Sequence, residues 1–359
     1  MTLCDVQSQA LPGVRIGRAA VGEDAPVYIV AEAGVNHDGK LAQALALVDA
    51  AADAGANAVK FQVFRAADLV TQSAPTAAYQ KRAGSGNSQR RMLERLELSD
   101  GDLARVQARC AERGIEFLAT PFGTDDVARI VRLGVAAIKI ASTDLNNRPL
   151  LEVVIATELP LILSTGAANA AEIRQTLGWL RDAGAADRAV VLHCVSRYPT
   201  PLDAAHLRRI GALRDALGVC VGYSDHTDST FIGGWAAAAG ACLLEKHLTL
   251  DRAANGPDHA MSLDPSEFAA YVANVRRIEP ALGRRTLDMD ASEAEVRRLA
   301  RKSVVAKRAL EAHEVISADA LTLKRPGDGI PPTEIDRLVG RRTRRPVPAD
   351  TVLRWEMVE

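Results

Sequence analysis

Two histidines stand at positions where they could share a metal ion. His226 follows the apolar run VCVGYS, and His247 follows CLLEK one helix and one strand later. If both runs are neighbouring strands about 4.8 Å apart, two neutral imidazoles at matching heights can bind one divalent cation. Side chains alternate along a strand, so Glu245 and His247 share one face and Lys246 takes the other. Imidazole, carboxylate and water suit Mn²⁺ or Mg²⁺ better than thiolate-bound zinc. The alternative is that each imidazole is a hydrogen-bonded core group.

Two lysines and a set of hydroxyl groups indicate a second kind of chemistry. Lys60 in AVKFQVF and Lys139 in AIKIAST stand inside apolar runs, where an unpaired ammonium group is costly to bury. They must therefore pair with carboxylates such as Glu32 and Glu245, or face an anionic ligand. Hydroxyl groups that could donate to a phosphate follow the same kind of run: Thr120, Ser142, Ser164 and Ser224. Each hydroxyl alone is more typical of a helix cap, but their convergence with two lysines favours a phosphate.

The elements that must position these residues alternate along the chain. Eight short apolar runs predict strands, and segments of helical period lie between them. The strand candidates begin at Val27, Ala58, Glu116, Ala137, Pro160, Ala189, Val219 and Cys242. Eight such units in about 250 residues predict a (β/α)8 TIM barrel, whose functional groups lie at the C-terminal ends of its strands. An open doubly wound sheet is the alternative, but no GxGxxG motif follows the first strand.

The remaining polar residues are distributed as a barrel requires. Gln62, Ser196 and Tyr198 also lie at or just after the C-terminal ends of predicted strands. Alternation turns Asp225 away from the barrel axis, which indicates an orienting or structural carboxylate. A long polar segment, 70–99, separates the second and third strands, and insertions of this length commonly cover or line a site.

The chain divides into two predicted domains. An N-terminal extension covers 1–26, the barrel covers 27–283, and a charged linker covers 284–301. The last part, 302–359, contains short β-like runs separated by Pro and Gly turns. Because this rhythm differs from the strand and helix alternation before it, we expect a small domain with a core of its own.

The bulk composition excludes several classes of protein. The 359 residues are 48% hydrophobic and carry a formal net charge of -1, so neither a nucleic acid nor a membrane surface is expected as a partner. No run approaches the roughly 20 apolar residues of a membrane span. Five cysteines without a CxxC pair are typical of reduced thiols, and the N-terminus has no secretory pattern. A cytoplasmic location is therefore expected.

Short motifs spread along the chain resemble those of the sialic acid synthases. They are, in order, EAGVNHDG, VKFQ, TPF, KIAS, STG, LHC, YPTP, GYSDHT, EKHLTLDR, GPDH and KRPGDGI, and they cover almost the whole chain from Ile29. The resemblance implies a TIM barrel followed by a small antifreeze-like SAF domain of the β-clip type, assembled as a domain-swapped homodimer. It also implies condensation of phosphoenolpyruvate with an N-acylated hexosamine such as N-acetylmannosamine, which gives a nine-carbon nonulosonic acid and phosphate.

The resemblance further implies roles for single residues. His226 and His247 match ligands of a divalent metal, usually Mn²⁺, with Mg²⁺ or Co²⁺ as alternatives, and Glu32 matches the catalytic carboxylate. Residues that match the phosphoenolpyruvate site are Lys60, Thr120, Lys139, Ser142, Ser164, Ser224 and Ser196, the last where the family often has Asn. Residues that match the sugar site are Gln62, Tyr79, Tyr198, Glu245, Asp258 and Arg325. The arginine is expected to enter the barrel of the partner subunit.

The identity of the acceptor sugar stays open from the sequence. The segment with Tyr79, Gln80 and Gln89 resembles the sialic and legionaminic acid branches. An N,N'-diacetyllegionaminate synthase that uses 2,4-diacetamido-2,4,6-trideoxymannose is therefore an alternative, and an unphosphorylated sugar is favoured over a 6-phosphate. Two further alternatives are a 3-deoxy-ulosonate phosphate synthase that takes a phosphosugar, and a non-catalytic relative that binds metal or carbohydrate.

Overall fold

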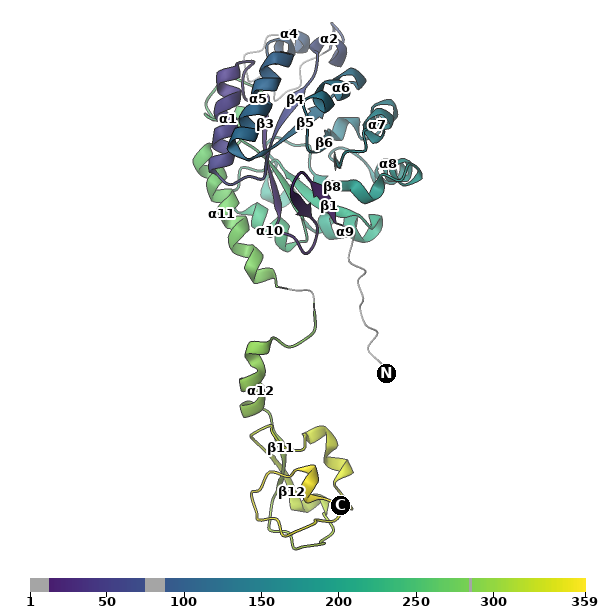
Figure 1. The fold of residues 1–359 in the computed structure, drawn as a ribbon, viewed down its shortest axis with the longest axis vertical. Coiled ribbons are helices and arrows are strands. Elements are labelled where there is room, and N and C mark those ends of the chain that lie inside the picture. The colour runs from purple at the N-terminus through teal and green to yellow at the C-terminus, as the bar shows by residue number, and fades with distance from the viewer. Residues whose placement is uncertain (1–12, 75–87, 284–285) are drawn as a thin grey trace. The chain divides into compact units, whose positions relative to one another are not determined.

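The computed structural model describes residues 13–74, 88–283 and 286–359 of the chain. The chain forms two compact units, Met1–Gly283 and Arg284–Glu359. Figure 1 shows the helices of the first unit arranged around its strands. Within the described residues, no helix combines the length and the hydropathy that crossing a lipid bilayer requires.

Eight parallel strands close into a barrel in the first unit. Each strand pairs with its neighbours in chain order, and the last strand pairs with the first. The strands are β3 (Tyr28–Gly34), β4 (Ala58–Val63), β5 (Glu116–Pro121), β6 (Ile138–Ile140), β7 (Leu161–Ser164), β8 (Ala189–Cys194), β9 (Cys220–Asp225) and β10 (Leu243–His247). Both faces of these strands are buried, which accounts for the nearly continuous apolar runs in the sequence. The predicted TIM barrel with its eight strands is thus confirmed.

Helices connect the strands and cover the outside of the barrel. They are α1 (Leu41–Asp53), α2 (Ala66–Leu69), α4 (Gln89–Glu94), α5 (Asp100–Arg113), α6 (Thr124–Arg132), α7 (Arg148–Ile155), α8 (Ala170–Asp182), α9 (Arg208–Leu217), α10 (Ile232–Ala238) and α11 (Pro265–Leu282). Local sequence sets their ends: the Ser99 hydroxyl accepts a hydrogen bond from the Asp102 amide at the start of α5, and Gly114 ends that helix at φ 67°. Side chains such as Leu47 and Val59 fill the layer between helices and strands.

A short hairpin packs against the N-terminal ends of the barrel strands. It consists of β1 (Val14–Ile16) and β2 (Ala19–Val21), which pair antiparallel. Its apolar side chains, Ile16 among them, are buried in one cluster with Tyr28 and Leu243 from the starts of two barrel strands. The sequence alone predicts this part of the chain only as a piece of the N-terminal extension, 1–26. Strands of three residues give too short a pattern to be recognised without the surface on which they pack.

The second unit has a core of its own. A helix, α12 (Ala294–Ala300), precedes two antiparallel strands, β11 (Ser303–Ala306) and β12 (Leu321–Lys324). Isolated bridges, such as the one between Val305 and Val352, tie the later turns to these strands. The core is formed by apolar residues from the whole unit: Val304, Ala306, Leu310, Ile316, Leu338, Val347, Leu353 and Val358.

Candidate active site

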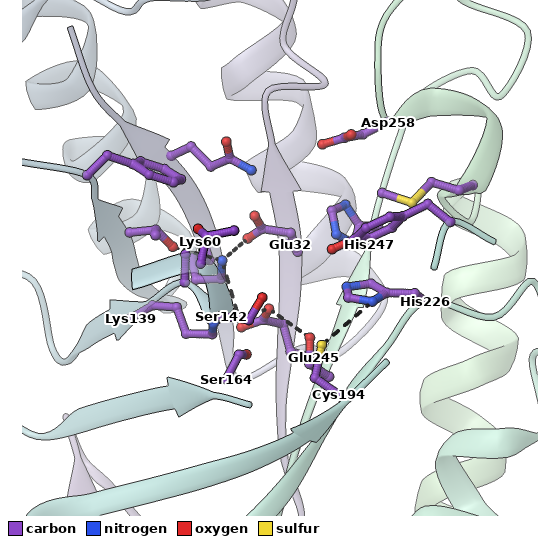
Figure 2. Close-up of a pocket in the computed structure, with 18 of the residues that line it drawn as sticks. Glu32, Lys60, Lys139, Ser142, Ser164, Cys194, His226, Glu245, His247 and Asp258 are labelled. Carbon is purple, nitrogen blue, oxygen red and sulfur yellow. Dashed lines mark hydrogen bonds and ion pairs between the residues drawn. The ribbon is translucent and has the colours of Figure 1, made fainter. Parts of the chain in front are cut away.

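A cavity of about 310 Å³ opens at the C-terminal ends of the barrel strands. Thirteen of the predicted site residues line it: Glu32, Lys60, Gln62, Thr120, Lys139, Ser142, Ser164, Tyr198, Ser224, His226, Glu245, His247 and Asp258. Figure 2 shows the lysines and serines on one side of the cavity, the two imidazoles on the other, and the two glutamates between them. The long segment between β4 and β5 also contributes to the wall, through Val70, Gln89 and Leu93.

Two buried lysines and two buried glutamates form a linked set of ion pairs. Lys60 Nζ lies 2.6 Å from Glu32 Oε2 and 3.7 Å from Glu245 Oε2, and it donates a hydrogen bond to Thr120 Oγ1. Lys139 Nζ lies 3.9 Å from Glu245 Oε1. The pairing of the lysines with Glu32 and Glu245, one of the two alternatives drawn from the sequence, is therefore confirmed. Both lysines also line the cavity, and an anionic ligand there stays a prediction.

The surroundings push the pKa values of the two glutamates apart. Burial raises the pKa of Glu32, and Lys60 opposes this only in part, while the charge of Glu245 adds to it. Burial acts on Glu245 as well, but there Lys139 and Lys60 outweigh it, and the pKa of Glu245 is lowered. Glu245 therefore keeps its negative charge between the lysines. Glu32 is the carboxyl group that is more ready to take up a proton.

The pKa values of the two lysines are also shifted in opposite directions. Burial pushes the pKa of Lys60 down, but Glu245 and Glu32 together raise it above its ordinary value. Burial dominates at Lys139, whose pKa is lowered even though Glu245 opposes the shift. An added anion beside Lys139 would stabilise its charged form, so Lys139 is the lysine that is short of negative charge.

The two imidazoles lie side by side across the ends of β9 and β10. The ring centroids of His226 and His247 are 5.6 Å apart, and the ring of Tyr198 lies 4.3 Å from that of His226. His226 Nδ1 lies 2.8 Å from the carbonyl oxygen of Val195, which can only accept, so Nδ1 carries the proton and Nε2 keeps its lone pair. His247 Nδ1 is a buried nitrogen without a hydrogen-bond partner in the described structure.

The donor set fits a divalent metal held by two histidines. Burial lowers the pKa of His226 and lowers that of His247 further, so both rings are neutral and have lone pairs available. The described residues contain no group of three or more His, Cys, Asp and Glu side chains arranged to hold a metal ion. A metal at these two rings would therefore take its other ligands from water or substrate, which is the open coordination of a catalytic site.

Two hydroxyl groups and one thiol converge at the position where Gly166 has no side chain. A Cβ atom on Gly166 would lie 2.3 Å from Ser196 Oγ, 2.8 Å from Cys194 Sγ and 3.3 Å from Ser142 Oγ, so only glycine lets these polar tips converge. Ser164 Oγ is buried without a hydrogen-bond partner in the described structure. The hydroxyl oxygens of Ser196 and Ser142 are 3.5 Å apart. Ser142 lines the cavity, whereas Ser196 does not.

Asp258 reaches the cavity from the loop between β10 and α11. Its carboxyl group lies beside Glu32 and Gln62, because atoms of all three surround the position where Gly34 would carry a Cβ. Burial raises the pKa of Asp258 to about 7, and the charge of Glu32 contributes to the shift. Asp258 is therefore partly protonated at neutral pH, and its carboxyl group can donate as well as accept a hydrogen bond.

His259, which was not among the predicted site residues, holds the loop between β10 and α11 in place. His259 Nδ1 lies 2.6 Å from Thr249 Oγ1, and His259 Nε2 lies 3.1 Å from Asp38 Oδ1. The contact joins the loop after β3 to the loop after β10, and it fixes the residue next to Asp258. His259 is the last residue of the motif GPDH. Its partner Asp38 lies more than two hundred residues away in the chain, so the sequence carries no signal for this contact.

Tyr79 and Gln80 lie outside the described residues. Arg325 belongs to the second unit, where its side chain is exposed. Cys194 lines the cavity, whereas the sequence predicts it only as a reduced thiol. It follows an outward-facing histidine in LHC, so alternation along the strand could have identified it as an inward residue.

Similarity to known proteins covers both units. The NeuB family matches residues 47–286, and the SAF domain matches residues 301–359. The N,N'-diacetyllegionaminic acid synthase of Legionella pneumophila is 39% identical to this chain over 342 residues, which are 94% of this chain and 96% of that protein. The protein of the same name from Campylobacter jejuni is 38% identical over 91% of this chain and 98% of its own length.

A solved structure gives the same result. The N-acetylneuraminic acid synthetase of Leptospira borgpetersenii matches with a TM-score of 0.72 and 34% identity, over 80% of this chain and 95% of that one. The recognition of a sialic acid synthase from its motifs is confirmed, as is the barrel with a C-terminal SAF domain. The chain therefore belongs to the NeuB family of metal-dependent synthases.

Proposed function

We propose that this chain condenses phosphoenolpyruvate with an unphosphorylated N-acylated hexosamine, and that it releases inorganic phosphate and a nonulosonic acid. The observation that carries the proposal is one cavity in which three pairs of groups meet: the ammonium groups of Lys60 and Lys139, the carboxyl groups of Glu32 and Glu245, and the imidazoles of His226 and His247. The lysines suit an anionic substrate, the glutamates suit proton transfer, and the imidazoles suit a Lewis acid.

The metal site of the proposal consists of His226 Nε2 and His247. Mn²⁺ is the proposed ion, with Mg²⁺ and Co²⁺ as alternatives, because neutral imidazole with oxygen ligands suits ions of this class. A metal bound there would polarise the aldehyde of the open-chain sugar, which the weakly nucleophilic C3 of phosphoenolpyruvate needs. The neutral rings and the fixed tautomer of His226 support this assignment.

The lysine side of the cavity is assigned to phosphoenolpyruvate. Lys139, whose charge Glu245 compensates only in part, lines the cavity together with Ser142 and Ser164, and Ser164 has a buried hydroxyl without a partner in the described structure. A phosphate or carboxylate of the substrate would satisfy both. The remaining residues of this proposed site are Lys60, Thr120, Ser142, Ser224 and, at its edge, Ser196.

Glu32 is proposed to manage the proton of the attacking water. When C3 forms its bond to the aldehyde carbon, positive charge develops at C2, and a water oxygen adds there. Glu32 takes one proton from that water, and this proton ends on the former aldehyde oxygen, which becomes a hydroxyl group. The bond from C2 to the bridging phosphate oxygen then breaks, and the oxygen leaves with the bonding electron pair. The second water proton passes from the C2 hydroxyl to the departing phosphate as the C2 keto group forms. The raised pKa of Glu32 suits this role, because a base with a very low pKa accepts a proton poorly.

Four other residues of the cavity are assigned to the sugar. Gln62, Tyr198 and Asp258 line the cavity, and Glu245 lies between the two lysines. The partly protonated carboxyl group of Asp258 can pair with a sugar hydroxyl in either direction. Tyr79, the other proposed sugar contact, lies outside the described residues.

A domain-swapped homodimer is proposed to complete the site, with Arg325 of one subunit binding the N-acyl group in the barrel of its partner. Arg325 is exposed on the second unit, as a residue that acts on another subunit must be. The segment before the SAF domain exposes apolar side chains, among them Leu287 at 97% and Val296 at 65% of their surface. A second copy of the chain would cover such residues, because exposed apolar patches mark association surfaces.

The acceptor is either N-acetylmannosamine or 2,4-diacetamido-2,4,6-trideoxymannose. The second is favoured by the names of the relatives from Legionella pneumophila and Campylobacter jejuni, which match over nearly the whole chain. The reaction is placed in the cytoplasm. The structure has four buried free cysteines among its described residues, which suits a reducing compartment.

The test is a comparison of acceptors with mass spectrometry of the products. Phosphoenolpyruvate and Mn²⁺ are incubated with each of the two sugars, with N-acetylmannosamine 6-phosphate, and with a pentose phosphate. The proposal expects a nonulosonic acid and an equal amount of phosphate from one or both unphosphorylated sugars. A product from the pentose phosphate alone would favour the 3-deoxy-ulosonate phosphate synthases. Turnover of none of the four would favour a non-catalytic relative.

A further inference from the structure

A buried ion pair lies on the outer side of the barrel, directly below the two imidazoles. Asp225 and Lys246 are the last residues of β9 and β10 that stand opposite each other in the strand register. His226 and His247 follow them immediately in the chain. Because side chains alternate along a strand, the pair faces the helices, whereas the histidines face the cavity.

The pair is embedded in further contacts. Asp225 Oδ2 lies 3.0 Å from Lys246 Nζ, and both side chains are completely buried. Lys246 Nζ also donates a hydrogen bond to the carbonyl oxygen of Thr227. The amide of Thr227 donates to Asp225 Oδ1 at 2.8 Å, and the hydroxyl of Tyr223 donates to the same oxygen at 3.4 Å. The ring of Tyr271 on α11 closes the site, with its centroid 5.7 Å from Lys246 Nζ.

These contacts fix the backbone on both sides of His226. Asp225 precedes His226, and Thr227, whose amide and carbonyl are both bound by the ion pair, follows it. His247 is attached to the other member of the pair through the backbone of Lys246. One cross-strand contact therefore acts on the backbone beside both imidazoles, together with the ladder between β9 and β10.

An ion pair is an expensive way to hold two strands together. Two charges lose their hydration on burial, and well-packed apolar side chains in the same place often give equal or greater stability. The next outward pair in the register, Tyr223 on β9 and Leu244 on β10, is buried and uncharged. The change to a charged pair occurs at the position next to the two imidazoles, where exact placement matters most.

We propose that Asp225 and Lys246 are positioning residues that hold His226 and His247 at the separation a shared divalent metal requires. The inference rests on the metal site of the proposed function, and it adds two residues that orient the proposed ligands from behind. Groups behind the ligands of a metal commonly orient them, and their loss weakens metal binding without removing a ligand. A pair that served only stability would leave the metal affinity of the folded protein unchanged.

The test compares two double variants with the wild-type full-length protein. Asp225→Asn with Lys246→Met removes one charge of each sign, so the net charge near the imidazoles stays the same. Asp225→Asn with Lys246→Gln removes the same charges but keeps a donor that can reach toward Thr227. Binding of Mn²⁺ alone to metal-free protein is measured by electron paramagnetic resonance of the free ion.

The expected result is a graded loss of affinity. The dissociation constant for Mn²⁺ should rise about 10- to 100-fold in the Met variant. It should rise less in the Gln variant, while the dissociation constant for phosphoenolpyruvate, measured without metal, should stay within about twofold. Unchanged Mn²⁺ affinity in folded Met variant would overturn the inference. If the Met variant does not fold, unchanged affinity in the Gln variant overturns it equally.

Two controls separate this inference from the proposals beneath it. Asp126→Asn with Arg129→Met removes another largely buried ion pair, 2.8 Å long and located on α6 on the outside of the barrel. It should change stability and leave Mn²⁺ affinity as it is. The second control is His226→Ala, which should abolish Mn²⁺ binding. If His226→Ala binds Mn²⁺ like the wild type, the proposed metal site is wrong. If His226→Ala loses Mn²⁺ binding, the metal site holds, and the double variants then test only the role of the ion pair.

Discussion

His226 Nδ1 lies 2.8 Å from the carbonyl oxygen of Val195, and this one contact decides which ring nitrogen can bind a metal. The carbonyl forces the proton onto Nδ1, so that the lone pair of Nε2 is presented on the other side of the ring. Burial keeps the ring neutral by lowering the pKa of His226. The imidazole therefore has a free lone pair on Nε2, as the proposed metal site requires.

Replacing this ring should abolish the metal-dependent reaction. For His226→Ala we expect the Mn²⁺-dependent release of phosphate to fall at least about 100-fold, because Lewis-acid activation of the aldehyde contributes several kcal/mol. His193→Gln is the matched control. His193 is equally buried, lies on the neighbouring strand and bonds to Ala205, but it faces away from the cavity. Full activity in His226→Ala, with Mn²⁺ present, would contradict the metal assignment.

The two lysines should respond to substitution in opposite ways. Burial lowers the pKa of Lys139 although Glu245 opposes the shift, so its charge costs folding free energy that a bound anionic ligand would offset. Lys139→Met should therefore weaken phosphoenolpyruvate binding about 10- to 100-fold, as expected for loss of a charged hydrogen bond, and leave the free energy of unfolding equal or higher. Calorimetric titration and urea denaturation measure the two quantities.

Lys60→Met is the companion variant. The pKa of Lys60 is raised because Glu245 and Glu32 outweigh its burial, so this charge stabilises the folded state. Its removal leaves the buried carboxylate of Glu32 without its partner at 2.6 Å, and the free energy of unfolding should fall by about 3 kcal/mol. Equal stability in the two lysine variants would contradict the contrast between the two environments.

The carboxyl group of Asp258 should make stability depend on pH. Its pKa is raised by burial and by Glu32, from 3.8 to about 7 in the folded chain. Between these values the folded chain holds a proton that the unfolded chain has released, so the free energy of unfolding falls as pH rises through this window. Above pH 7 the whole penalty is present, at about 1.4 kcal/mol per pKa unit.

Asp258→Asn tests this directly in metal-free protein. The variant should gain stability over the wild type at pH 8, and the gain should shrink by about 3 kcal/mol when the pH is lowered to 5. Denaturation curves at the two pH values give the comparison. A gain of the same size at both would show that Asp258 does not titrate in this range.

Gly166 should be replaceable only at a cost to the phosphoenolpyruvate site. The added methyl group of Gly166→Ala would lie 2.3 Å from Ser196 Oγ and 2.8 Å from Cys194 Sγ, so it must displace both. We expect the Michaelis constant for phosphoenolpyruvate to rise about tenfold, which corresponds to about 1.4 kcal/mol. A second change, Ser196→Gly, should recover part of the loss because it removes the hydroxyl group with which the added methyl group collides.

Gly178 provides the control for this substitution. It lies inside α8, where an added Cβ would meet no atom within 4 Å. Gly178→Ala should leave the kinetics unchanged and raise the free energy of unfolding by about 1 kcal/mol, because alanine has the higher helix propensity. If Gly166→Ala bound phosphoenolpyruvate as the wild type does, the site near this glycine would have been assigned incorrectly.

The sequence predicted the barrel and the inward residues because both follow from local periodicity. Alternation along CLLEKH was sufficient to place Glu245 and His247 inside and Lys246 outside, and the structure has them so. The same rule turned Asp225 outward, but it could not show that Lys246 lies opposite. Which residue lies opposite Asp225 depends on the register between the two strands. The hydrophobic pattern shows which face a residue takes, but it does not distinguish registers that differ by two residues.

What escaped the sequence depends on contacts between distant segments. The raised pKa of Asp258 comes from a loop that folds back over the strand carrying Glu32, and the loop is held by a contact between His259 and Asp38. Loop conformation of this kind has no periodicity to read. The hairpin ending at Val21 was missed for a similar reason, since its three-residue strands are stable only against the barrel.

The dimer proposal can be tested by complementation, since Glu32 and Arg325 lie in different units of the chain. Glu32→Ala and Arg325→Ala are each expected to be nearly inactive, the second mainly through weaker sugar binding. In a swapped heterodimer of the two variants, one active site carries both defects and the other carries none, so about half of the wild-type activity should return. If each subunit instead used its own arginine, every site would carry one defect. Heterodimers purified with two different tags that show no recovery would therefore contradict the swap, whereas the kinetics of the separate variants cannot distinguish the two arrangements.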